Sequence, residues 1–330
     1  MITALLFAAS AVILIVAAEL FTNAVEWAGY RLRLGSGATG SLLAAIGTSL
    51  PETIVPVVAL ATRSPSADSV ATGAVLGAPF LLLTLGAAFT GVAVLLRRGR
   101  RELVLDRRQP RRDLGVFLAG FSLALLCILL PFPLRVTAGT LLLMGYIAYV
   151  VRTLRSSVPD EEMPEPLHIV RWIVREEPHG VLIALQLVIA VGLLVLGSQL
   201  FVGALDSVAA ALSISPLVLA LIVAPMATEL PESLNGVLWV RSGDDGLAFG
   251  NIAGSSAFQA TVLASIGLVF TSWHPGVDGL IGALLALLSA TFLLAVLWRG
   301  RARGFVLALA GIPWLGYVVA QLVTGGHLAR

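Results

Sequence analysis

The sequence predicts an all-α integral membrane protein with about ten transmembrane helices, built as two inverted five-helix repeats. The first observation is composition, since 58% of the 330 residues are hydrophobic and only 12% are charged. A soluble domain of this length needs far more charged surface. The second observation is a series of ten apolar stretches, and the third is a repeat that relates the first five to the last five.

The apolar stretches set the predicted organisation of the chain. Those of the first half lie near residues 3–25, 41–62, 70–96, 114–134 and 136–151. Those of the second half lie near 180–204, 215–240, 246–271, 278–298 and 304–324. A helix needs roughly 20 apolar residues to cross a bilayer, so these spans account for nearly the whole chain. We expect a membrane repeat over 1–155, a solvated acidic cytoplasmic linker over 156–178 and a second, inverted repeat over 179–330.

The distribution of arginine predicts the orientation. All 21 basic residues are arginine, and a chain with its N-terminus outside keeps all of them except Arg63, Arg135 and Arg330 on the inside. Positive residues stay cytoplasmic, so we expect a multi-pass protein of the cell membrane with both termini outside. The linker and the arginine-rich loop 97–112 are then cytoplasmic. Between two spans this loop indicates topology and not nucleic-acid binding, so the expected partners are the lipid bilayer and inorganic cations.

Several protein classes are excluded by what the apolar stretches lack. The single cysteine, Cys127, lies in one of them, which excludes a disulfide and a cysteine metal cluster. The four histidines map to loops or termini, and no nucleophile is paired with a base at membrane depth. We therefore expect no enzyme and no cofactor, only transported cations. The first stretch lacks a positive n-region and recurs later in the chain, which favours a helix over a signal peptide.

The two halves are related by an internal repeat. At an offset of 180, Leu50-Pro51-Glu52 matches Leu230-Pro231-Glu232, and Thr48 matches Thr228. Each half holds five spans, an odd number, so the second half enters the membrane from the opposite side. Inverted repeats are typical of secondary transporters, whose sites lie near the midplane on helices broken by glycine and proline.

Acidic residues inside the apolar stretches give the strongest indication of function. Only Glu19, Glu52, Glu229 and Glu232 lie well inside them, and no arginine does. An ionised carboxylate at this depth costs about 3 kcal/mol even on lenient scales, so these groups need a bound cation or a proton. Glu19 is the least certain of the four, because it lies outside the repeated proline segment; a gate, a proton carrier and a plain interhelical hydrogen bond are all open for it.

Glu52 and Glu232 occupy equivalent places, each directly after a proline. Proline removes a backbone donor and frees carbonyl oxygens in the preceding turn. The hydroxyls of Thr48, Ser49 and Thr228 add neutral oxygens beside each carboxylate. This ligand set suits a hard cation such as Ca²⁺, which accepts about six to eight oxygens. The alternative is that each glutamate caps a kinked helix.

The halves differ at Glu229, whose first-half counterpart is Ser49. One helical turn separates Glu229 from Glu232, so the two carboxylates lie close together and double ionisation is disfavoured. The alternative is a protonated glutamate bonded to a neighbouring carbonyl.

A second element repeats at an offset of 177 and carries two glycines in each half, which allow close helix contact. In the second half it has a polar strip made of Asn251, Ser255, Ser256 and Gln259. These side chains could supply oxygen ligands or simply pack between helices. In the first half Ala78 and Leu82 stand at the places of Ser255 and Gln259, so only one strip is polar.

These segments resemble the calcium/cation antiporter superfamily, the sodium/calcium exchanger-like transporters. Residues 47–52 reproduce the family's GTSLPE signature, residues 227–232 are a variant of it, and residues 250–256 resemble its GNxxGSN segment. The resemblance implies that Glu52 and Glu232 are central calcium ligands, helped by Thr48, Ser49 and Thr228, and that Ser255 belongs to a flanking ion site.

The chain departs from the family pattern at four places. Ala78 and Leu82 replace a Ser and an Asn, Gln259 replaces an acid or Asn, and Glu229 replaces a Ser. Several sodium ligands implied by the resemblance are thus lost, while one carboxylate is gained.

We therefore expect a secondary active antiporter that exchanges Ca²⁺ for Na⁺ or H⁺ by alternating access at paired, membrane-embedded glutamates. The expected cation ligands are Glu52, Glu232, Glu229, Thr48, Ser49, Thr228, Ser255, Asn251 and Gln259. The alternatives are a monovalent Na⁺/H⁺ antiporter that uses the same glutamates and, from another class, a passive cation channel. The inverted repeat favours alternating access. The sequence predicts neither the stoichiometry nor the oligomeric state.

Overall fold

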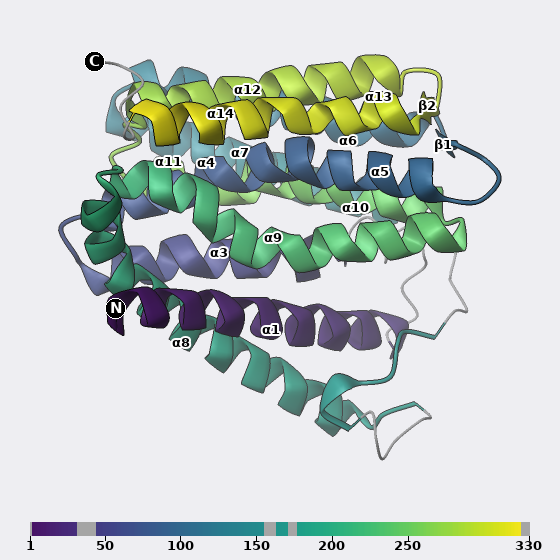
Figure 1. Cartoon of the computed structure of the whole chain (residues 1–330), viewed down its shortest axis with the longest axis horizontal. Coiled ribbons are helices and arrows are strands. Elements are labelled where there is room, and N and C mark those ends of the chain that lie inside the picture. Colours follow the sequence, from purple (N-terminus) through teal and green to yellow (C-terminus); the bar gives the residue numbers. More distant parts are fainter. Residues whose placement is uncertain (1, 32–43, 155–162, 171–176, 325–330) are drawn as a thin grey trace.

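The computed structural model describes residues 2–31, 44–154, 163–170 and 177–324, with side chains from residue 5 onward except those of 44–48, 50, 153, 154, 231 and 232. This part of the chain forms a bundle of long helices that lie side by side (Figure 1). Nine helical segments in it are long and apolar enough to cross a membrane, and a shorter apolar helix over Pro51–Thr62 lies between the first two. Each predicted span contains a described helix, and the chain is an all-α integral membrane protein.

The first half begins with α1 (Ile2–Arg31), α3 (Ala44–Thr62) and α4 (Ala67–Leu81). The π-helix η2 (Leu82–Gly86) and α5 (Ala87–Leu96) continue the same span as α4. Strand β1 (Glu102–Val104), α6 (Arg108–Leu126), the short η3 (Cys127–Leu129) and α7 (Phe132–Leu154) complete this half. Asp68 lies in the first turn of α4, where a negatively charged carboxylate interacts favourably with the helix dipole.

The second half begins after η4 (His168–Val170) with α8 (Gly180–Leu212) and α9 (Pro216–Ser242). One span then combines α10 (Asp245–Phe258), the π-helix η5 (Gln259–Leu263) and α11 (Ala264–Phe270). It is followed by α12 (Gly276–Val296), β2 (Arg301–Arg303), α13 (Gly304–Ala308), η6 (Leu309–Gly311) and α14 (Ile312–Thr324). The start of α9 is set by Ser215, whose Oγ accepts a hydrogen bond from the Val218 N–H at 3.2 Å.

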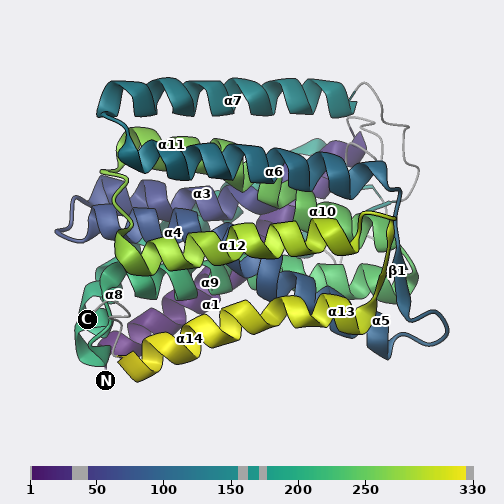
Figure 2. The same ribbon diagram turned by 90° about the horizontal axis from the view of Figure 1, so that it is seen from above.

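Helix packing follows the inverted repeat. Helix α4 packs against α9 as α10 packs against α3, and α12 packs against α4 as α6 packs against α10. Likewise α13 contacts α5 as α7 contacts α11, and Figure 2 shows α7 and α14 on opposite flanks of the bundle. One apolar core lies among α4, α6, α10 and α12, and another lies among α1, α3, α8 and α9. The two repeats therefore interlock through contacts between the halves.

The two ends of the bundle differ in charge. Strands β1 and β2 pair antiparallel, with Glu102 opposite Arg303, at the end away from the start of α1 and the end of α14 (Figure 1). Of the described arginines, all except Arg63 and Arg135 lie at the β1–β2 end. The concentration of arginine at one end of the bundle agrees with the positive-inside rule. Which side of the membrane this end faces stays a prediction.

The expectation that proline breaks the helices is wrong for α3 and α9. Pro51 and Pro56 lie within α3, and Pro225 and Pro231 lie within α9, yet both helices are continuous. Neighbouring helices and hydroxyl groups can satisfy the backbone groups that a membrane proline frees. The irregularities fall instead in the next span of each half, as η2 and η5.

Residues 163–170, one of the two described parts of the linker, pack against α1 and are not simply solvated. Both Asn23 Nδ2, at 3.1 Å, and Trp27 Nε1, at 2.8 Å, donate hydrogen bonds to the carbonyl oxygen of Glu165. Leu167 is only 1% exposed and joins an apolar cluster with Trp27. The linker is therefore docked at this point because α1 offers two side-chain donors to its backbone.

Candidate functional site

Glu52 and Ser49 lie on α3 and face the interior of the bundle. Glu52 is 3% exposed and Ser49 is fully buried. Pro56 lies one turn after Glu52 and has no N–H to bond the Glu52 carbonyl oxygen. Thr53 Oγ1 donates to the Ser49 carbonyl oxygen at 3.1 Å. The segment thus combines a buried carboxylate, a buried hydroxyl and a carbonyl oxygen that proline releases from the helix ladder.

Glu229 lies on α9 and is fully buried. Its Oε1 accepts a hydrogen bond from Gln259 Nε2 at 2.5 Å, which joins α9 to the first residue of η5. The neighbouring Thr228 is 3% exposed, and its hydroxyl donates to the Ala224 carbonyl oxygen of its own helix at 3.3 Å. A buried carboxylate held by a neutral amide can accept either a cation or a proton.

The polar strip of the second half is buried along its whole length. Asn251 is 1% exposed, and Ser255, Ser256 and Gln259 are fully buried. Ser256 Oγ donates to the Ile252 carbonyl oxygen at 2.7 Å, so its hydroxyl is satisfied within α10. The side-chain oxygens of Asn251 and Gln259 instead accept no hydrogen bond from the described residues.

Several buried acceptors have no hydrogen bond within the described part of the chain. Three of them, Ser49 Oγ, Asn251 Oδ1 and Gln259 Oε1, belong to predicted ligands. Buried polar atoms in native proteins are nearly always satisfied, and water or an ion supplies the contact when protein does not. Since α3 packs against α9, α10 and η5, the elements that carry these oxygens meet in one region.

Ser233 belongs to the same region and was missed by the sequence analysis. It follows Glu232 on α9, is 2% exposed, and its Oγ has no hydrogen bond among the described residues. A Cβ atom placed on Gly86 would lie 3.2 Å from this oxygen, so Ser233 faces η2. The repeat contained the signal, because Thr53 holds the matching position after Glu52.

Glycine brings α4 against the backbone of α9, as expected. A Cβ atom on Gly73 would lie 2.3 Å from the Leu217 carbonyl oxygen, and one on Gly77 would lie 2.2 Å from that of Leu221. Pro225 has no N–H to bond the Leu221 carbonyl, so Gly77 packs on an oxygen that proline has released. Any larger residue at Gly77 would have to move this backbone.

Gly250 has a described contact with a side chain. A Cβ atom there would lie 2.3 Å from the Nε2 of Gln109 on α6. Gln109 Nε2 also donates to the Gly246 carbonyl oxygen at 3.1 Å. In the second half the glycine therefore makes room for a polar side chain.

The π-helices η2 and η5 are a symmetric feature that the sequence analysis did not predict. They begin at Leu82 and Gln259, which are 177 residues apart. Thr84 and Thr261 are also equivalent, and each donates its hydroxyl to the carbonyl four residues earlier. π-Helices are rare and are frequent at functional sites. Only the second begins with a polar side chain, so the two halves differ at this point.

Two predicted ligands lie outside the described side chains. The backbone of Thr48 is in α3 and that of Glu232 is in α9, but neither side chain is described. Their roles stay predictions. Within the described residues no group of three or more His, Cys, Asp or Glu side chains is placed to hold a metal ion. The described candidates are the carboxylates of Glu52 and Glu229 with neutral oxygens around them.

Glu19 has a basic partner, contrary to the sequence-based expectation for acids in the spans. Its Oε1 lies 3.3 Å from His168 Nε2, and its side chain is 42% exposed. The hydrogen bond to Glu19 raises the pKa of His168 above its usual value, and burial opposes this only in part. The partner comes from the docked linker, so no pattern within the span could indicate it.

Two further buried acids were not recognised, and both are paired with arginine. Asp245 is 2% exposed and binds Arg97 at 2.5 Å and Arg100 at 2.6 Å. Asp113 is fully buried and binds the adjacent Arg112 at 2.6 Å. Both lie near helix starts at the β1–β2 end, where arginine is close by. We therefore assign them a structural role.

The chain matches one protein family over both repeats. The family described as "Sodium/calcium exchanger protein" matches residues 2–155 and 182–323. This chain belongs to the sodium/calcium exchanger protein family. The family consists of membrane transporters, which agrees with a multi-pass protein that acts on inorganic cations.

Two curated relatives match this exchanger-family protein over most of their length. One is "Putative antiporter CaxA" of Alkalimonas amylolytica, 27% identical over 93% of this chain and 94% of the relative. The other is "Inner membrane protein YrbG" of Escherichia coli strain K12, 28% identical over 84% of each chain.

Solved structures share the fold. The H⁺/Ca²⁺ exchanger CAX has a TM-score of 0.77 and 18% identity, with 97% of this chain and 82% of that chain covered. The sodium-calcium exchanger NCX_Mj, soaked with Na⁺ and Sr²⁺, has a TM-score of 0.64 and 19% identity, with 97% and 98% covered. At these identities the likeness establishes the fold, including the inverted repeat that is typical of such exchangers.

Proposed function

We propose that this exchanger-family protein is a secondary active antiporter that exchanges Ca²⁺ for protons, with Na⁺ as the alternative coupling ion. The cation binds to carboxylates on α3 and α9 and to neutral oxygens on the same helices and on α10. These ligands are Glu52, Glu229 and Glu232, with Thr48, Ser49, Thr228, Asn251, Ser255 and Gln259. No resident cofactor takes part.

The observation that carries the proposal is the hydrogen bond from Gln259 to Glu229, which lies fully buried between α9 and η5. An amide orients a carboxylate but does not neutralise it, and in an apolar surrounding a bound cation or a proton stabilises the carboxyl group. A carboxylate that alternates between the two is what an antiporter requires. Glu52, also buried, supplies the same chemistry from the other repeat.

Charge balance favours the proton as the second ion. Glu52, Glu229 and Glu232 carry three negative charges when ionised, and one Ca²⁺ compensates two of them. A single uncompensated charge in a low-dielectric cavity is costly, so the third carboxylate takes up a proton when Ca²⁺ is bound. Ca²⁺ release then allows the remaining carboxylates to take up protons for the return step.

The asymmetry of the repeats weakens the sodium alternative. Ala78 is 1% exposed and Leu82 is fully buried, and neither offers an oxygen ligand. Their second-half counterparts, Ser255 and Gln259, do so. With these oxygens missing on one side, fewer neutral ligands remain to replace the hydration shell of several sodium ions.

The relatives are compatible with either coupling ion. The fold is shared by a protein described as an H⁺/Ca²⁺ exchanger and by one described as a sodium-calcium exchanger. The fold by itself therefore accommodates both, and the identity of residues 78, 82, 229 and 259 supports the choice of proton. Inverted repeats meeting at the site also suit alternating access better than a permanently open channel.

The experiment that tests the proposal is uptake of radioactive Ca²⁺ into proteoliposomes. A pH gradient imposed without sodium should drive accumulation of Ca²⁺ above its equilibrium level, and collapse of the gradient should release it. Accumulation only with a sodium gradient would establish sodium coupling instead. Ca²⁺ flux that merely follows its own gradient would indicate a channel, and sodium–proton exchange without Ca²⁺ movement would indicate a monovalent antiporter.

A further inference from the structure

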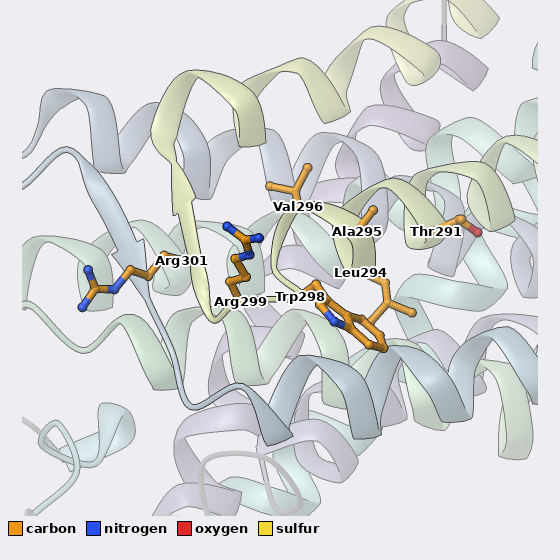
Figure 3. Close-up of a pocket in the computed structure, with 7 residues that line it drawn as sticks. All are labelled: Thr291, Leu294, Ala295, Val296, Trp298, Arg299 and Arg301. Atoms are coloured by element: carbon orange, nitrogen blue, oxygen red, sulfur yellow. The ribbon is translucent and has the colours of Figure 1, made fainter.

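A shallow pocket of about 560 Å³ lies at the end of α12, outside the proposed cation site. Leu294 and Val296, on the last turn of α12, form its apolar wall. Trp298 and Arg299, on the turn that follows, and Arg301, the first residue of β2, line its other side, and Thr291 and Ala295 of α12 complete the lining (Figure 3). The pocket therefore joins an apolar surface to a cationic one.

The turn that carries the cationic part is held rigidly. Gly300 has a φ of +71°, a conformation that favours glycine, and a Cβ atom there would lie 2.5 Å from the Leu105 carbonyl oxygen. The carbonyl oxygen of Gly300 accepts a hydrogen bond from the Leu105 N–H at 2.8 Å. The backbone between Arg299 and Arg301 is thereby fixed to the β1 segment, so both arginines start from a defined place beside the pocket.

Trp298 is fixed from the other side by Arg111 of α6. The Arg111 guanidinium lies 4.1 Å from the centre of the Trp298 ring, and its Nη2 donates to the Trp298 carbonyl oxygen at 2.7 Å. Trp298 nevertheless remains 52% exposed. One aromatic face is occupied by Arg111, and the rest of the ring borders the pocket.

The charge of the pocket is positive and is not compensated locally. Arg299 and Arg301 are exposed and form no ion pair with any described residue. The acid nearest along the β-ladder, Glu102, is paired with Arg303 at 3.7 Å. The lining itself contains no acidic residue. A ligand that fits must therefore carry negative charge.

The position of the pocket in the membrane indicates an amphiphilic ligand. The span formed by α12 ends at Val296, and β2 begins only five residues later. The pocket thus lies where the hydrocarbon core gives way to the headgroup region, the level at which tryptophan is enriched. Basic pockets at this level attract anionic headgroups.

We propose that this pocket binds an anionic phospholipid. The phosphate lies against Arg299 and Arg301, one acyl chain lies along Leu294 and Val296, and Trp298 packs at the junction of the two. The turn that carries Arg299 and Arg301 is fixed at Gly300, so the pocket does not have to form when the lipid binds. It does not depend on the transport activity proposed above.

The test uses the purified full-length protein in detergent micelles, titrated with phosphatidylglycerol or phosphatidylcholine. Brominated acyl chains should quench the fluorescence of Trp298 more strongly in phosphatidylglycerol than in phosphatidylcholine. The difference should be lost in Trp298→Phe, which leaves the other tryptophans in place. Equal quenching by the two lipids in the wild-type protein would overturn the proposal.

Two double variants with the same change of charge separate the pocket from general attraction. Arg299→Gln with Arg301→Gln should weaken phosphatidylglycerol binding about thirtyfold, as expected for two arginines near a lipid surface. Arg98→Gln with Arg241→Gln removes two exposed arginines of the same membrane end outside the pocket and should change binding less than about twofold. Equal losses in the two variants would overturn the proposal. Saturation by inorganic phosphate, with no further binding of lipid, would reduce the site to an anion site and also overturn it.

Discussion

Asp68 and Asp245 are equivalent residues, 177 positions apart, and each ties its own repeat to the other one. Asp68, at the start of α4, accepts hydrogen bonds at 2.6 Å from the N–H and from the hydroxyl of Ser272, just after α11. Asp245, at the start of α10, binds Arg97 and Arg100, just after α5. A contact between the two repeats thus occurs at each end of the bundle. The partner of the aspartate is a neutral serine at one end and two arginines at the other.

This asymmetry predicts unequal losses of stability. Asp245→Asn leaves the largely buried Arg97 without its partner, and we expect a loss of about 3 kcal/mol in the free energy of unfolding. Asp68→Asn keeps a side chain that can still accept from Ser272, and we expect a loss of about 1 kcal/mol. Thermal unfolding of both variants in the same detergent gives the comparison. A larger loss for Asp68→Asn would contradict the assigned roles.

The proposed cation site predicts loss of transport without loss of fold. Glu52→Gln and Glu232→Gln should each abolish Ca²⁺ uptake, because the amide cannot compensate a divalent ion or exchange a proton. Helical content and membrane expression should be unchanged. Asp106→Asn, at the exposed start of α6, is the matched control and should transport normally. Uptake at the wild-type rate in both glutamate variants would remove these residues from the site.

Glu229 and Gln259 predict the proton dependence of transport. The wild-type rate should change between about pH 5.5 and 8.5 without sodium, because the site exchanges a cation for protons. Glu229→Ser removes the extra carboxylate and should blunt the pH dependence of transport. Gln259→Leu copies the first-half residue Leu82 and removes the donor to Glu229, so it should shift the profile without flattening it. A flat wild-type profile with strict sodium dependence would contradict proton coupling.

The charge difference between the ends predicts the topology. A cysteine at Arg98, exposed in the loop after α5, should resist an impermeant maleimide added to intact cells in a Cys127→Ser background. A cysteine at Pro65, exposed at the opposite end, should react rapidly. Gln109 is less suitable for labelling because it packs against Gly250. Rapid labelling at Arg98 from outside would invert the orientation of the whole bundle.

His168 predicts that docking of the linker weakens as the pH rises. The hydrogen bond to Glu19 raises the pKa of His168 above 6.5, and Glu26 on α1 and Glu165 in the linker lie near the same imidazole. The docked state therefore holds a proton that the undocked state loses near neutral pH. Docking is strongest below about pH 6.5 and weakens as the pH rises through the raised pKa.

Hydrogen exchange of residues 163–170 measures this docking. Exchange should become faster from pH 6 to pH 9, after correction for the intrinsic rate, and His168→Gln should remove the excess pH dependence. The same dependence in His168→Gln would place its origin elsewhere. Transport by this variant provides a second readout, which distinguishes a local docking role from a role in the exchange cycle.

The sequence alone determined the membrane class, the spans, the inverted repeat and the buried candidates Glu52 and Glu229. It could do so because the length of an apolar stretch and a charged residue within it can be read from a short segment. An odd number of spans per repeat also fixes the inverted orientation of the second repeat, whatever the helix packing. The repeat also marked Ser233, through Thr53, although its meaning became visible only when its hydroxyl was found against η2.

Tertiary structure decided the remaining partners, because they come from segments that are distant in the chain. The bond between Glu229 and Gln259 spans 30 residues, and the contact between Glu19 and His168 spans 149. The partner of Asp245, Arg97, likewise lies 148 residues away in the chain. Such contacts are set by the packing of the whole bundle, so no local pattern in the sequence indicates them.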